Sequence, residues 1–221
     1  MKSTIAAFVL LVGLCCFAHA QAFSFGLSYD YLSSPQLDNS VRTYNLSRPF
    51  VDEKQPFLTS GLGLEGGYLL PSDQSIRFGI KTGYANHRSK RTGTGSTIQL
   101  SLNTIDLGLL LHFEKPSLKG GYLDASVSGI VGILSKRVDQ EPYLVDGSRL
   151  RSYQVGGLLG LSAGYKLRLN ERIQLSPFAG MKFAPYFSDG KSEALINQTS
   201  TLVEGETFFW KWQLGIRLHL N

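Results

Sequence analysis

An alternation of apolar residues with small or polar ones runs along the whole chain, and it limits the fold more than any other feature. It is clearest near the C-terminus, in the apolar positions Phe208, Trp210, Trp212, Leu214, Ile216, Leu218 and Leu220. Successive side chains of a β-strand point to opposite faces, so a period of two predicts strands with one apolar and one polar face. Eight such segments lie at about 23–31, 58–70, 75–86, 97–113, 121–136, 150–169, 173–186 and 207–220. We therefore predict an all-β chain of eight strands.

The connections between these segments are short and long in turn. The short ones cover about 71–74, 114–119 and 170–172, and the long ones about 33–56, 87–96, 137–149 and 187–206. Short connections join antiparallel neighbours, so the pattern predicts an up-and-down order with every short turn at one end. Both termini then lie at that end, which we expect in the periplasm, and four longer loops lie outside.

The alternation changes phase within the fourth segment. Ile98, Leu100 and Leu102 are even-numbered, whereas the apolar residues from Ile105 to Phe113 are odd-numbered. A β-bulge near position 103 or 104 would bring both halves onto one face of the sheet. We therefore expect a bulge there.

Segment length and residue size favour a membrane barrel over a soluble one. Strands of about 12 or more residues, tilted by about 40°, reach about 25–30 Å, the height of the apolar band of an outer-membrane barrel. The alternative is a lipocalin-like barrel with an apolar interior. The polar face is rich in Gly and Ser, which suits the crowded lumen of eight strands, and the apolar face has aromatic residues near segment ends, as lipid-facing girdles do. These are Phe23, Tyr31, Tyr68, Tyr84, Phe113, Tyr153 and Trp210.

The N-terminus has the pattern of a secretory signal peptide. Lys2 supplies a positive charge, an apolar run extends from Ile5 to Ala18, and Ala18 and Ala20 are the small residues expected before a cleavage site. The run is shorter than the roughly 20 residues that a membrane-spanning helix needs. We expect export by the general secretory route and cleavage after Ala20, which leaves a signal peptide at 1–20 and a barrel domain at 21–221.

The composition excludes several other classes. Both cysteines, Cys15 and Cys16, lie in the segment expected to be removed, so disulfides and thiol chemistry are not expected in the mature chain. The net charge of +5 is modest and spread along the sequence, so nucleic acid is not an expected partner. No apolar run after residue 21 is long enough for a transmembrane helix, so membrane insertion requires a closed barrel.

These features together resemble the OmpA/OmpX-type barrels and the PorT-like outer-membrane β-barrel family over nearly all of residues 22–221. The resemblance implies an eight-stranded antiparallel up-and-down transmembrane β-barrel in the bacterial outer membrane, and it implies little about activity. The stretch from Gln213 to Leu220 also looks like the β-signal that barrel-assembly machinery recognises, with its key positions at Gln213, Gly215, Leu218 and Leu220. It departs from the common bacterial form by ending in Asn221 instead of an aromatic residue. This likeness implies assembly machinery and periplasmic chaperones as partners during biogenesis.

The polar faces of the predicted strands carry a set of charges that would meet inside the barrel. Folding back at the short turns places Glu65 near Lys81 and His112 near Asp124 on adjacent strands. We interpret the set as an ion-paired network that closes the lumen; an anion-preferring conduit is the alternative, although eight strands leave little open bore. Its members are Asp30, Glu65, Arg77, Lys81, Asp106, His112, Asp124, Lys166, Arg168, Lys182, Lys211 and Arg217.

The second long connection begins with the basic residues His87, Arg88, Lys90 and Arg91. Clustered Arg and Lys suit the phosphates of lipopolysaccharide, so these four are candidate contacts to it; a solvated loop is the plainer interpretation. His87 and Ser89 also form a His-x-Ser pair, similar to that of outer-membrane lipid A deacylases, where a base activates a serine. The plainer interpretation is that the two residues lie at a loop edge without a catalytic role.

We therefore expect an integral outer-membrane protein, monomeric and not an enzyme, with a structural role or a loop-mediated interaction role in the envelope. A narrow pore and a lipid-modifying enzyme are the alternatives. The sequence shows no paired carboxylates of glycosidase type, no phosphate-binding Gly loop and no metal-ligand cluster. No cofactor or metal is expected.

Overall fold

The computed structural model describes residues 22–47, 54–72, 74–93, 96–114, 117, 119–140, 149–189 and 205–220. The expected signal peptide and its cleavage site at Ala18 and Ala20 lie outside these residues. The strands are β1 (Ala22–Ser33), β2 (Ser60–Leu69), β3 (Ile76–Gly93), β4 (Ser96–Glu114), β5 (Gly121–Gln140), β6 (Arg149–Tyr165), β7 (Leu167–Arg168), β8 (Ile173–Asp189) and β9 (Gly205–Leu220). The described helix is α2 (Pro35–Leu46).

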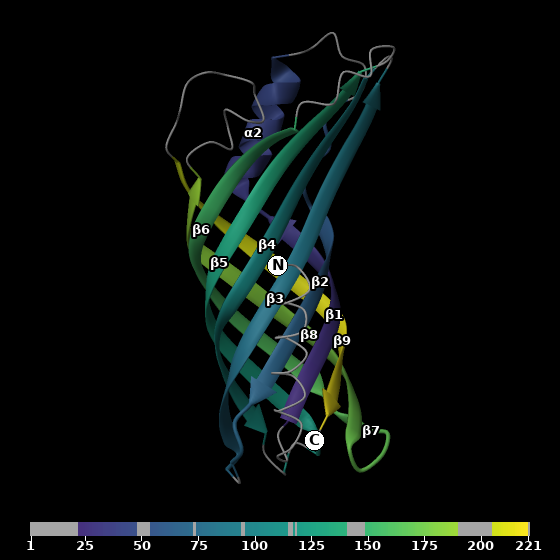
Figure 1. Cartoon of the computed structure of the whole chain (residues 1–221), viewed down its shortest axis with the longest axis vertical. Coiled ribbons are helices and arrows are strands. Elements are labelled where there is room, and N and C mark those ends of the chain that lie inside the picture. Colours follow the sequence, from purple (N-terminus) through teal and green to yellow (C-terminus); the bar gives the residue numbers. More distant parts are fainter. Residues whose placement is uncertain are drawn as a thin grey trace, which may run out of the picture.

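Eight long antiparallel strands form a closed barrel, as the sequence predicts. Neighbours in the chain pair along the sheet from β1 to β6, and β9 pairs with both β8 and β1. Pairing of β6 with β8 completes the wall, because β7 is only a two-residue strand in the turn between them. Figure 1 shows α2 at one end of the barrel and β7 at the other. We call these the helix end and the turn end.

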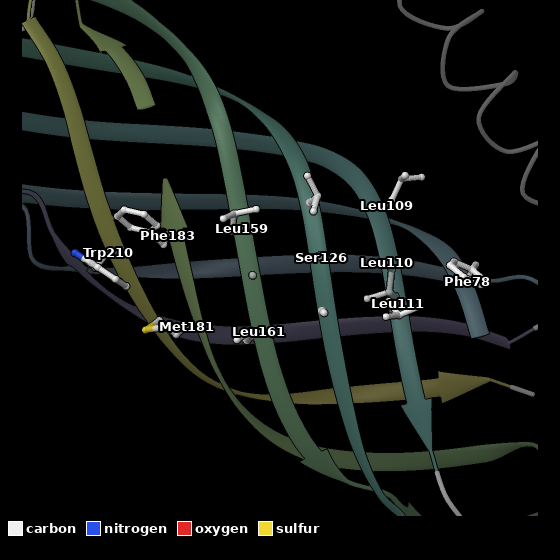
Figure 2. Close-up of a pocket in the computed structure, with 13 residues that line it drawn as sticks. Phe78, Leu109, Leu110, Leu111, Ser126, Leu159, Leu161, Met181, Phe183 and Trp210 are labelled. Atoms are coloured by element: carbon white, nitrogen blue, oxygen red, sulfur yellow. The ribbon is translucent and has the colours of Figure 1, made fainter. Parts of the chain in front are cut away.

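The outward face of the wall is apolar over most of its height. Leu109 is 70% exposed and Leu214 is 66% exposed, which in a folded barrel requires lipid around them instead of water. A shallow apolar groove of about 650 Å³ crosses this face from Phe78 to Trp210. Figure 2 shows its side chains on neighbouring strands, Leu109, Leu159 and Phe183 among them.

Toward the helix end, the two faces of the wall exchange character. Leu100 and Leu102 on β4 point into the barrel and are buried, whereas the alternate residues Ser101 and Asn103 point outward. The register between β4 and both of its neighbours is continuous through these positions. The predicted bulge at 103 or 104 is therefore wrong. The change of phase is instead a change of surroundings, with an apolar interior and a polar exterior at this end, as in a soluble protein.

The helix α2 explains the apolar interior at this end. Pro35 occupies the first turn of the helix, where a missing backbone N–H costs nothing. Leu37, Val41 and Tyr44 follow at helical spacing and are buried. They pack in one cluster with Leu58, which lies just before β2, and with apolar residues of the wall, namely Leu32, Ile98, Leu100, Leu102, Ile130, Leu134, Leu158, Ala184 and Phe209. The connection at 33–56, expected to be an external loop, thus contains a helix that closes the barrel.

The connection expected at 87–96 is also different from the prediction. β3 continues to Gly93 and β4 begins at Ser96, so most of that stretch is a paired extension of the wall. Among the described residues, no helix is long and apolar enough to cross a bilayer.

Candidate functional site

Glu65 on β2 is the centre of the charged interior. Its carboxylate lies 3.2 Å from Lys81 Nζ, 3.1 Å from Lys182 Nζ and 3.0 Å from Arg217 Nη2. These cations come from β3, β8 and β9, so one buried carboxylate joins strands from different sides of the barrel. Lys182 also reaches Asp106 on β4 at 3.3 Å. Alternation alone predicts the Glu65–Lys81 pair, because the two residues lie on the lumen faces of adjacent strands.

Toward the turn end, the network continues from Arg217 to a histidine. Arg217 bonds to Asp124 on β5, and the other carboxylate oxygen of Asp124 lies 2.6 Å from His112 Nδ1. His112 Nε2 lies 3.3 Å from Glu114, which also accepts hydrogen bonds from Arg77 and Lys166. The predicted His112–Asp124 pair is therefore present, as one link in a longer chain.

Toward the helix end, a third cluster holds the seam between the first and last strands. Lys211 Nζ on β9 lies 3.1 Å from Asp30 Oδ2 on β1. The other carboxylate oxygen accepts hydrogen bonds from Ser28 at 2.6 Å and from Gln213 Nε2 at 3.0 Å. Carboxylates paired with cations therefore follow one another along the lumen, from Glu114 at the turn end, through Glu65, to Asp30 in the seam cluster.

Of the twelve residues predicted for this network, only Arg168 is misplaced. It is exposed on β7, outside the lumen. The alternation continues past Tyr165 in the sequence, but the wall strand ends at that residue. Beyond the end of a strand, an odd or even position no longer predicts which face a side chain lies on. The prediction also missed Tyr122, which is buried and whose hydroxyl accepts hydrogen bonds from Arg217 at 3.2 Å and Ser176 at 2.9 Å. A large aromatic on an otherwise polar face is the signal that identifies it.

Above the charges, α2 fills the mouth of the barrel. Its following segment is held in place, since Gln55 N donates to Asn45 Oδ1 at 2.8 Å and Gln55 Nε2 donates to Ser89 Oγ at 2.9 Å. Lys136 Nζ lies 5.0 Å from the centre of the Tyr44 ring, within cation–π range. The interior thus has two layers, a charge network and an apolar plug.

No family model matches the chain, and no curated protein matches it. Among solved structures, it is similar to a major outer membrane protein from Thermus thermophilus, with 13% sequence identity and a TM-score of 0.51 over 91% of this chain and 100% of that one. Neisserial surface protein A matches at 13% identity and a TM-score of 0.46, over 91% of this chain and 97% of that one. Ail of Yersinia pestis matches at 11% identity and a TM-score of 0.48, over 91% of this chain and 100% of that one.

The chain has the fold of a small OmpA/OmpX-type outer-membrane barrel. Because the outside of its wall faces lipid, the four basic residues near the helix end fall into two groups, according to whether they point into the barrel or out of it. His87 is 1% exposed and Arg91 is also buried, so both face the interior and neither is available to lipid. Arg88 and Lys90 point outward. Ser89 is buried beside Gln55, so the His87–Ser89 pair is not placed to reach a lipid ester.

The four positions of the expected assembly signal lie on β9, which closes this outer-membrane barrel. Gln213 points into the lumen, and Leu218 and Leu220 lie on the outward face. Gly215 sits where added atoms would overlap the Leu27 backbone and the Phe178 ring. Among the described residues, no group of three or more His, Cys, Asp or Glu side chains could hold a metal ion.

Proposed function

We propose that this protein is a closed, non-conducting barrel of the bacterial outer membrane, with a structural and interaction role in the cell envelope. The observation that carries the proposal is the filled lumen. An ion or solute entering from the helix end meets the apolar plug, and one entering from the turn end meets the paired charges. Among the described residues, apolar side chains fill the first layer and ion pairs fill the second.

The charges support closure more strongly than conduction. A conduit for anions needs cations that are free to bind a passing ion, as rings of Arg or Lys do in anion pores. Here Lys81, Lys182 and Arg217 all converge on Glu65. Because buried charges are costly unless paired, these cations are held by structure and are not available for transport.

The proposed orientation places the turn end in the periplasm and the helix end at the cell surface. The described chain starts and stops at the turn end, with Phe23 in register with Leu220. In this orientation the plug and the strand extensions of β3, β4 and β5 meet the outside. These parts would carry contacts with the envelope or with partners.

Conductance of the purified full-length mature protein tests the proposal. In planar bilayers made from phosphatidylcholine alone, we expect rare small current steps or none. A general porin reconstituted in the same bilayers serves as the positive control. Arg217→Ala provides a matched variant, because it removes the guanidinium group that bonds to both Glu65 and Asp124; its steps should be more frequent than those of the native protein. Steady conductance of porin size by the native protein would refute closure.

A further inference from the structure

The outward face of β3 to β6 changes from apolar to basic over a short distance near the helix end. In register across these four strands, Tyr84, Ile105, Val131 and Val155 form an apolar row. Four residues closer to the helix end along β3, the corresponding row is Arg88, Ser101, Ser135 and Arg151. Four residues along a strand correspond to about 13 Å, which is the distance between the two rows. The transition marks the level at which lipid tails give way to headgroups.

Between these two rows lies an intermediate one, formed by Asn86, Asn103, Ile133 and Tyr153. Asn86 Nδ2 donates to Asn103 Oδ1, and Tyr84 donates to the same oxygen at 2.9 Å. Tyrosines are enriched where the membrane meets water. The amide pair is therefore placed at the base of the headgroup layer.

A concave site lies on this face. Its volume is about 380 Å³, and its lining residues are Asn86, Arg88, Gln99, Ser101, Asn103, Ser135 and Arg137. The two serines are small and lie between the longer Arg88 and Arg137, so the centre of the site is hollow. The described residues that line it include two arginines and no carboxylate. Lys90 and Arg151 extend the positive charge on either side of it, on β3 and β6.

The chemistry of this lining selects a class of ligand. Guanidinium groups bind phosphate through paired hydrogen bonds. The amides and hydroxyls beside them can both donate and accept, which matches sugar hydroxyl groups. A ligand with phosphates and sugar hydroxyls, held at the level of the headgroups, is a phosphorylated glycolipid.

We propose that this site, formed by Arg88, Arg137 and the polar residues between them, binds the phosphorylated sugar headgroup of an outer-leaflet glycolipid such as lipopolysaccharide. The inference rests on the proposed orientation of the barrel, with the helix end at the cell surface. It assigns the contact to the outward wall of β3 to β5. Of the four basic residues in the sequence motif, it retains Arg88 and Lys90 and leaves out His87 and Arg91.

The test uses full-length mature protein in nanodiscs of phosphatidylcholine that contain a small fraction of bisphosphorylated lipid A. Native mass spectrometry measures how much lipid A stays bound when the protein is released from the disc. The native protein should retain it, and Arg88→Ala/Arg137→Ala should retain about tenfold less or lower still. Arg168→Ala, which removes an exposed arginine at the turn end, should bind as the native protein does. A folded-barrel gel shift confirms that each variant is intact.

Further arms identify the ligand. Dephosphorylated lipid A and phosphatidylglycerol should each be retained less than bisphosphorylated lipid A, since the first lacks the phosphates and the second lacks the sugar. Equal retention of either would overturn the glycolipid assignment. So would displacement of lipid A by millimolar inorganic phosphate, or tighter binding of a sulfated polysaccharide through the same arginines. Equal retention of lipid A by the native protein and the double variant would overturn the site itself. Conductance is measured without glycolipid, so none of these results decides whether the lumen is closed.

Discussion

Arg217 Nη2 on β9 donates a hydrogen bond to Glu65 Oε2 on β2 at 3.0 Å, across the intervening strand β1. Gly26 of β1 is in register with both residues. A Cβ atom there would lie 3.6 Å from Glu65 and 3.7 Å from Arg217, so the position has room for little more than a methyl group. The pair therefore spans the strand at which the barrel closes, and it links the first hairpin to the last strand.

Glu65→Leu should destabilise the barrel strongly. It would leave Lys81, Lys182 and Arg217 without the carboxylate that they share, and removing one partner of a buried ion pair costs about 3–5 kcal/mol. The matched control is Leu64→Ala on the next residue, whose side chain faces outward. The measurement is the temperature at which the folded band on a gel converts to the unfolded one. If Leu64→Ala lowers this temperature more than Glu65→Leu does, the inward and outward faces have been assigned the wrong way round.

Val41→Asp should release the plug. Val41 is 1% exposed in the apolar cluster at the mouth of the barrel, and burial of an unpaired carboxylate costs several kcal/mol. We expect trypsin added to intact cells to cut at Arg42 on the same helix much faster than in the native protein. Thr43→Asp places the same side chain on the exposed face of α2, so it should leave cleavage slow. Equally fast cleavage in both variants would show that the helix is not held by the cluster.

Gly215→Val should impair closure of the barrel. A side chain at this position would overlap the Leu27 carbonyl oxygen, and its Cβ would lie 2.7 Å from the Phe178 ring. Gly129→Val is the control, because a Cβ at Gly129 has nothing within 4 Å. The fraction of protein that resists urea extraction from membranes should fall for Gly215→Val and stay near the native level for Gly129→Val. Equal fractions would mean that the seam tolerates the added atoms.

The period of two was enough to predict the walls, the seam and the main ion pairs. Asp30 and Lys211 are far apart in sequence, but a barrel must join its first and last strands, and parity places both side chains inside. Their separation of 3.1 Å confirms this reasoning. Barrel closure and alternation therefore predict strand pairing and side-chain direction wherever the chain remains in the wall.

The same rule failed where the surroundings change. Leu102 is buried in the lumen because the wall there is in contact with α2 instead of the charge network. The alternation of β4 continues without interruption, but the sequence does not show at which residue lipid gives way to water. The helix itself was visible in part, since Pro35 is followed by Leu37, Val41 and Tyr44 at helical spacing. The cluster that stabilises it comes from strands distant in the sequence.

The placement of Arg88 and Arg91 shows the same limit at the candidate site. The two residues are three positions apart on one strand, so their side chains point to opposite faces. If the segment were a loop, as the sequence alone predicts, all of its basic side chains could contact the same ligand. Only the paired register of β3 with β4 separates them.

The strand β9 makes the final prediction, which concerns assembly. Within residues 214–220, β9 pairs with Phe23 to Tyr29 of β1 on one side and with Ile173 to Ala179 of β8 on the other. Removing residues 214–221 would leave both edges unpaired in lipid, where each unsatisfied backbone group is costly. The truncated chain should therefore be exported, fail to insert and be degraded in the periplasm.

A second variant separates closure of the wall from recognition by assembly machinery. Leu218→Ala/Leu220→Ala keeps the backbone of β9 but removes two hydrophobic positions of the expected assembly signal. We expect it to insert more slowly than the native chain, and the inserted molecules should form heat-stable folded barrels. Urea extraction of membranes followed by immunoblotting measures insertion for both variants, with a gel shift to report folding. A truncated chain that remains in the membrane and migrates as a folded barrel would refute the closing role of β9. Normal insertion rates for the double variant would refute the signal while leaving that closing role intact.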